Sequence, residues 1–111
     1  MRILHVNNIL HMGGVLRHMR DHAECARHRG HTVWLAGYAP PGHALHDDAS
    51  FVHLPLYTTS GRKSMHGALR AALRLRAMVL RERIDVVHLH SRYTTLIAAL
   101  AGAQRHTAVM Y

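Results

Sequence analysis

The strongest constraint on the fold is a strand–helix–strand pattern in the first 36 residues. Ile3, Leu4 and Val6 form an apolar strand, apolar residues recur at helical spacing over residues 15–29, and Thr32–Ala36 is a second apolar strand. Because one helix joins the two strands, they must lie parallel with a right-handed crossover. A parallel sheet needs helices on both faces, so the chain is expected to be an α/β protein.

The rest of the sequence continues this alternation of strands and helices. Strands are predicted at Phe51–Leu54, Ile84–His90 and Thr107–Tyr111, with helices at Met65–Arg83 and from Thr94 or Thr95 to Ala101; residues 37–48 are predicted to form a loop. These elements predict one Rossmann-like, doubly wound domain over residues 1–111, with about five parallel strands in the order 3-2-1-4-5 and three helices. A last strand is normally followed by a covering helix, so we expect a fragment or one half of a split protein.

Both long predicted helices are amphipathic. The first is expected to bury Leu16, Met19, Ala23 and Ala26, and the second to bury Leu69, Leu73, Ala77 and Leu80. The opposite side of the second helix is basic, with Arg70, Arg74, Arg76, Arg81 and Arg83. That helix is predicted either to pack on the sheet or to lie on a membrane surface.

Composition limits the classes of partner and compartment. The 111 residues carry a net charge of +8, which favours phosphates, anionic lipid surfaces or nucleic acid, or is simply a solvated basic surface. Nucleic acid is the least favoured partner because no stacking platform of aromatic and basic residues is evident. One cysteine, Cys25, fits a reducing compartment, and no apolar run is long enough to span a membrane, so a cytoplasmic protein is expected.

The pair Gly13-Gly14 stands between the first strand and the first helix. A glycine turn at a helix N-terminus lets an anionic ligand approach unpaired N–H groups. The pair is therefore a candidate phosphate-binding turn, although a purely structural tight turn fits the same residues. The spacing is not that of the dinucleotide-binding fingerprint.

A second candidate site follows the fourth predicted strand, at His88, His90, Ser91 and Arg92. Residues two apart in a strand share a face, so His88 and His90 are expected to point the same way. The strand should end beside the first strand, at the topological switch point where ligands bind in open α/β sheets. His90 and Arg92 could then contact a hydroxyl or a phosphate. The alternatives are a buried structural His88 and a solvated Arg92.

The thirteen histidines raise the question of a metal site. His18 and His22 are four residues apart on one helix, which is a usable zinc-binding pair. No cysteine or acidic residue stands at a matching spacing, so no metal site is predicted.

Four motifs occur in order along nearly the whole chain. They are Arg2-Ile3-Leu4-His5-Val6, Gly13-Gly14-Val15 with Arg17-His18, Arg29-Gly30-His31-Thr32-Val33, and Asp85-Val86-Val87-His88-Leu89-His90-Ser91. Their succession resembles the N-terminal domain of GT-B glycosyltransferases, and most closely the family-4-like enzymes that build lipopolysaccharide, exopolysaccharide and glycolipids.

The resemblance implies a retaining enzyme that moves a sugar from a nucleotide diphosphate sugar to a glycan or lipid acceptor, with no cofactor beyond that co-substrate. It implies that Gly13 and Gly14 face the donor diphosphate and that His90, Ser91 and Arg92 line the acceptor side. The loop with Arg62 and Lys63 would grip an acidic or lipid acceptor at the inner face of the membrane. The family's nucleotide-binding C-terminal domain has no counterpart in the sequence, so the isolated chain is expected to be inactive until that domain is supplied in cis or in trans.

Two other functions fit the sequence. The chain is alternatively a non-catalytic phosphate- or nucleotide-binding module, or a basic peripheral-membrane subunit of a split glycosyltransferase.

Overall fold

The computed structural model describes residues 1–9, 13–58 and 62–110. In chain order the elements are β1 (Arg2–Ile9), α1 (Gly13–His28), β2 (Thr32–Tyr38), the 3-10 helix η1 (Ala44–Asp47), β3 (Phe51–His53), α2 (Met65–Arg81), β4 (Val86–Leu89), α3 (Arg92–Ala101), the 3-10 helix η2 (Ala103–Arg105) and β5 (Ala108–Met110). Tyr111, the predicted end of the last strand, lies outside the described residues.

The strands form one parallel sheet in the order β3-β2-β1-β4-β5. This confirms the predicted fold class and strand order. The central strands β1 and β4 are in register from Ile3 opposite Val86 to Val6 opposite Leu89. The chain leaves β1 toward β2 on one side and returns to β4 on the other, so the topological switch point lies between β1 and β4.

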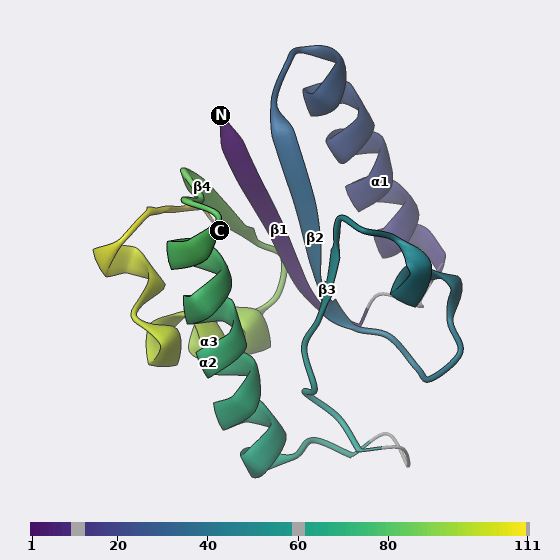
Figure 1. Ribbon diagram of the computed structural model, residues 1–111. Helices are drawn as coiled ribbons and strands as arrows, with labels where there is room; N and C mark the ends of the chain where they lie inside the picture. The colour runs from purple at the N-terminus through teal and green to yellow at the C-terminus, as the bar shows by residue number, and fades with distance from the viewer. Residues whose placement is uncertain (10–12, 59–61, 111) are drawn as a thin grey trace.

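Helices cover the two faces of the sheet, with α1 on one face and α2 and α3 on the other (Figure 1). The alternation of side chains along each strand produces two separate cores. Leu4 and Val6 of β1 pack in the core on the side of α2 and α3, whereas Val33 and Leu35 of β2 pack against α1. His5, between Leu4 and Val6, therefore points to the face that α1 occupies.

The predicted inner stripe of α1 is confirmed. Met19 and Ala23 are buried against β2, and Leu16 and Ala26 are half-buried beside them.

The predicted inner stripe of α2 is wrong. Leu69, Leu73 and Leu80 are 58%, 68% and 47% exposed, and Ala77 is also exposed. The helix instead buries a neighbouring stripe of mostly smaller residues, namely Gly67, Ala71, Ala72, Leu75, Met78 and Val79. A Cβ atom at Gly67 would stand 2.0 Å from the carbonyl oxygen of Pro55, so the backbones approach closely and only a residue without a side chain fits there. That approach fixes the rotation of α2 and leaves its leucines outside.

Several element boundaries differ from the predictions. The helix α1 begins at Gly13, and α3 begins at Arg92 because the Ser91 side chain caps it. The strand β2 continues to Tyr38, and η1 lies in the segment predicted as a loop. The strand β4 ends at Leu89, so His90 follows the strand.

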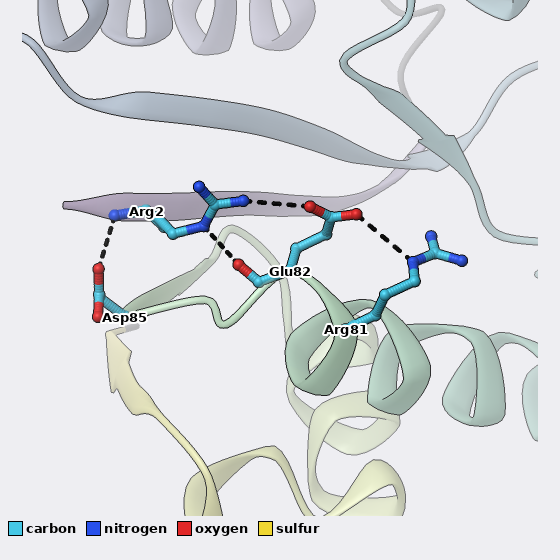
Figure 2. A network of polar contacts seen from close by, with 4 residues as sticks. All are labelled: Arg2, Arg81, Glu82 and Asp85. Carbon is cyan, nitrogen blue, oxygen red and sulfur yellow. Dashed lines mark hydrogen bonds and ion pairs between the residues drawn. The ribbon is translucent and has the colours of Figure 1, made fainter.

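At the amino ends of the parallel strands, which form the amino edge of the sheet, charged side chains pair with one another (Figure 2). The backbone N–H of Arg2 donates to the Asp85 carboxylate at 2.7 Å, and the Arg2 guanidinium lies 3.1 Å from the Glu82 carboxylate and also donates to the Glu82 carbonyl. The carboxylate of Glu82 also lies 3.4 Å from Arg81, and the Arg2 guanidinium lies 4.8 Å from the centroid of the Trp34 ring. These contacts connect β1 to the end of α2 and the start of β4.

Among the described helices, none combines the length and the apolar character needed to cross a bilayer.

Candidate functional site

The carboxyl ends of β1 and β4 lie side by side, as predicted. Val6 and Leu89 are in register, and the backbone N–H of His90 donates to the Val6 carbonyl at 2.9 Å. The next residue of β1, Asn7, is a polar side chain that is only 5% exposed. This edge is the topological switch point of the sheet, where open α/β folds place their ligands.

The predicted phosphate-binding pair is part of a helix. Gly13 and Gly14 are the first two residues of α1 and belong to its first turn, not to a turn before it. The first N–H groups of an α-helix have no partner within the helix, and they carry the positive end of its dipole. The segment between β1 and α1, residues 10–12, lies outside the described residues. The donor-side role of the glycine pair stays a prediction.

The three predicted acceptor-side residues differ in how they are held. The His90 ring nitrogen Nε2 lies 3.0 Å from Nδ1 of His5, a hydrogen-bond distance. The Ser91 hydroxyl caps α3 by accepting from the backbone N–H of Thr94 at 3.2 Å. Arg92 is exposed, and it forms no ion pair or hydrogen bond with any described residue. Of the three side chains, that of Arg92 is thus the one without a polar contact to a described residue, and its guanidinium is available to a ligand.

A cluster of aromatic and polar side chains at this edge was not predicted. Tyr57 and Tyr93 stack with ring centroids 6.1 Å apart, and the side-chain amide of Asn8 donates to the Tyr57 hydroxyl at 2.9 Å. The Lys63 ammonium lies 4.8 Å from the centroid of the Tyr93 ring. Contacts between an ammonium and an aromatic face contribute about 0.5–1 kcal/mol at exposed sites. These four residues come from β1, the segment before α2 and the start of α3.

The segment that carries Lys63 folds back on itself. Tyr57 and Lys63 form an antiparallel bridge, and the backbone N–H of Thr58 donates to the Arg62 carbonyl at 2.8 Å. This places the predicted basic pair at the carboxyl edge, with Lys63 over Tyr93 and Arg62 exposed. Residues 59–61 between them lie outside the described residues.

An apolar groove runs from this cluster between α2 and α3. It has a volume of about 380 Å³, and its walls are Lys63, Ser64, Met65, Ala68, Leu69, Tyr93, Leu96 and Leu100. Met65, Leu69, Leu96 and Leu100 are exposed. Large contiguous apolar patches on a protein surface mark sites of contact with ligands, membranes or other proteins. The groove has one cationic residue, Lys63, at its lining.

The histidines near the end of β4 are uncharged at neutral pH. Burial, and then the neighbouring imidazoles, lower the pKa of His5 to about 4, and the same causes lower that of His90 to about 4. Burial also lowers the pKa of His88. His90 therefore acts at neutral pH as a hydrogen-bonding imidazole and not as a cation.

Three of these histidines form a group with metal-ligand spacing. One nitrogen each from His5, His88 and His90 lies within 4.8 Å of the others. The shared face of His88 and His90 is predicted from their spacing, whereas His5, which is opposite His88 in the parallel pairing, was not predicted to join them. The predicted helical pair is also close, with the His18 and His22 rings 4.4 Å apart, and the His22 ring lies 6.3 Å from that of His5.

Two solved structures share this fold. A glycosyltransferase from Rickettsia africae matches 97% of this chain with a TM-score of 0.69 and 23% sequence identity, and the match covers 28% of its own length. MurG from Acinetobacter baumannii matches 97% of this chain with a TM-score of 0.66 and 15% identity, over 33% of its length. The chain thus spans about a third or less of each of these proteins.

No curated protein matches the sequence significantly. The family model of Glycosyltransferase Family 4 matches residues 12–111, which is nearly the whole chain. The parallel sheet with its switch point between β1 and β4 is the architecture that the sequence resemblance implied. The chain therefore belongs to Glycosyltransferase Family 4.

Proposed function

We propose that residues 1–111 form the acceptor-side domain of a retaining glycosyltransferase, which moves a sugar from a nucleotide diphosphate sugar to a lipid-linked or glycan acceptor. Family membership supports the transfer reaction, and the carboxyl edge of β1 and β4 supports its location. The donor diphosphate lies on the side of Gly13 and Gly14, where α1 presents its first N–H groups.

The observation that carries the acceptor class is the apolar groove that joins this edge. Its walls include exposed Leu69, Leu96 and Leu100 from two helices, and one end is formed by Lys63 and Tyr93. An apolar groove with a cation and a phenol beside it suits an amphiphilic acceptor, with its chain between α2 and α3 and its anionic head group at Lys63. Exposed Arg92 begins α3 and supplies a second cation. Each lysine or arginine near an anionic surface contributes about 1 kcal/mol to binding.

The same surface supports contact with an anionic membrane. Leu69 and Leu73 of α2, which were predicted to be buried, are exposed on this side, and arginines accompany them along the helix. In this proposal the protein works at the inner face of the membrane and takes its acceptor from the bilayer. The basic peripheral-membrane property is thus part of the transferase function and not an alternative to it.

Catalysis requires a second, nucleotide-binding domain, which is supplied in cis or in trans. The isolated chain is expected to show no hydrolysis or transfer when it is mixed with a panel of uridine, guanosine and adenosine diphosphate sugars. Clear turnover by the isolated chain would contradict this assignment. Micromolar binding of a nucleotide that Gly14→Val abolishes would instead support a nucleotide-binding module.

Co-sedimentation with lipid vesicles tests the acceptor side. The chain is expected to bind vesicles containing phosphatidylglycerol and to bind pure phosphatidylcholine much more weakly. Leu69→Gln, in the groove, should weaken binding by about tenfold, because the burial of one leucine is worth about 1.5–3 kcal/mol. Leu80→Gln is the matched control, since Leu80 is exposed on the same helix but does not line the groove. Equal effects of the two variants would refute the groove as the binding surface.

A further inference from the structure

We propose that His5, His88 and His90 form a binding site for Zn²⁺ on the face of the sheet beside α1, with the fourth coordination position open to water or to His22. Neither the family assignment nor the proposed transfer reaction assigns a metal to these residues, although His90 is also one of the predicted acceptor-side residues.

The backbone brings the three imidazoles together on adjacent strands. His5 of β1 is the register partner of His88 in β4, and His90 follows two residues later on the same face. The centroid of the His5 ring lies 5.2 Å from that of the His88 ring and 5.3 Å from that of the His90 ring. The His88 and His90 rings stack with their centroids 4.2 Å apart. Ligands on strands of a parallel sheet are held more rigidly than ligands on loops.

The nitrogen spacing is close to that of a zinc site. In a tetrahedral site with Zn–N bonds of about 2.0–2.1 Å, two ligand nitrogens stand roughly 3.3 Å apart. The His5 and His90 nitrogens are 3.0 Å apart, and one nitrogen from each of the three rings lies within 4.8 Å of the others. Rotations of the half-buried His88 and His90 rings supply the remaining adjustment.

The chemistry of the donor set selects the metal. Neutral imidazole suits zinc, copper and nickel, and three nitrogen ligands with one open position is a common zinc arrangement. Among the described residues, the His5–His90 contact is the one hydrogen bond that these three rings make, and a metal ion bound to both of its nitrogens would replace it.

The fourth ligand distinguishes two forms of the site. The centroid of the His22 ring in α1 lies 6.3 Å from that of the His5 ring in β1. If His22 closes the site, the metal links α1 to β1 and β4. If water occupies the position, the site stays open on the side of α1.

Calorimetric titration of the metal-free chain with Zn²⁺ alone tests the proposal. We expect one tight site, which His88→Gln weakens by at least tenfold, because even the loss of an outer-shell partner costs 10–100-fold in metal affinity. The matched control is His66→Gln, which removes an exposed histidine at the start of α2 and should leave the tight site unchanged. Tight binding that survives His88→Gln but is lost in His18→Gln would overturn the proposal in favour of the helical pair.

X-ray absorption of the unmodified chain, loaded with one equivalent of Zn²⁺, keeps the test independent of variant folding. Three or four imidazole ligands per zinc are expected, with four indicating His22. Two or fewer imidazole ligands per zinc would contradict the proposal. So would a zinc affinity no higher than that of isolated surface histidines.

Discussion

The two edges of the sheet differ in how their charged side chains are partnered. At the amino edge, Arg2 pairs with Glu82 and its backbone N–H with Asp85, so the charges there meet one another (Figure 2). At the carboxyl edge, Lys63 and Arg92 are exposed and form no ion pair with any described residue. The charges of Arg2, Glu82 and Asp85 are thus engaged with one another, whereas those of Lys63 and Arg92 are left available to an anionic ligand.

The largest expected effect on stability comes from the close approach of Gly67 to Pro55, which fixes the rotation of α2. Gly67→Ala should destabilise the chain by about 3 kcal/mol, because its Cβ would stand 2.0 Å from the Pro55 carbonyl oxygen and the overpacking must be relieved by backbone movement. Helix propensity alone predicts the opposite sign, a gain of about 1 kcal/mol. Urea denaturation measures the change, and Ala77→Gly at an exposed site of α2 calibrates the propensity term. A Gly67→Ala variant that gains stability would show that α2 does not rest on Pro55.

Acid should weaken the carboxyl edge before it affects the amino edge. The folded-state pKa of His5 and that of His90 are lowered to about 4 from 6.5, so between these values the unfolded chain binds more protons than the folded chain. The stability that these two histidines contribute is therefore expected to be lost as the pH drops from 6.5 toward 4, by on the order of 3 kcal/mol in total, and this contribution changes no further below that range.

Denaturation at pH 7 and pH 4.5 in the absence of metal measures this loss. His90→Gln should reduce the pH dependence, although His53 and His88, whose pKa values are also lowered by burial, retain part of it. The pKa of Asp48 is lowered by its hydrogen bonds from Ser50, so its contribution is lost only as the pH falls below its ordinary value of 3.8. A stability that stays constant from pH 6.5 to 4.5 would contradict the burial of neutral imidazoles.

A change at the amino edge should affect stability and leave vesicle binding intact. Asp85→Ala removes the acceptor of the Arg2 backbone N–H and is expected to cost about 1 kcal/mol. Urea denaturation and vesicle co-sedimentation of the same preparation check both parts. Loss of vesicle binding by this variant, with its fold intact, would remove the distinction between the two edges.

The converse change at the carboxyl edge should have the smallest effect on stability. Lys63→Ala is expected to alter the free energy of unfolding by no more than about 0.5 kcal/mol, because the side chain is exposed and its contact with Tyr93 is weak. Its affinity for vesicles with phosphatidylglycerol should fall about fivefold. Arg81→Ala, which removes an exposed cation at the carboxyl end of α2, beside Glu82, is the charge-matched control.

The sequence predicts the sheet well because its strongest signals are local. The first strand–helix–strand unit requires parallel pairing, and the later apolar runs extend the same topology. The orientation of α2 could not be predicted in this way, since its sequence holds two apolar stripes and only the approach of Gly67 to Pro55 decides between them.

The candidate site was predicted only where its sequence signals are local. His90, Ser91 and Arg92 follow a strand end, which is a local signal. The contacts of Tyr57 and Lys63 with Tyr93 depend on how the segment before α2 folds back, and no local pattern encodes that. The place of His5 beside His88 could have been found by aligning the two predicted parallel strands.

Ligand binding at the carboxyl edge is tested most directly by mapping backbone amide chemical shifts. The labelled chain is titrated with short-chain phosphatidylglycerol below its critical micelle concentration. The account predicts shifts at Lys63, Arg92 and Tyr93 and along the groove of α2 and α3, with Arg2 and Asp85 unchanged. Shifts concentrated at Arg2, Glu82 and Asp85 would contradict the assignment of the carboxyl edge as the ligand-binding side.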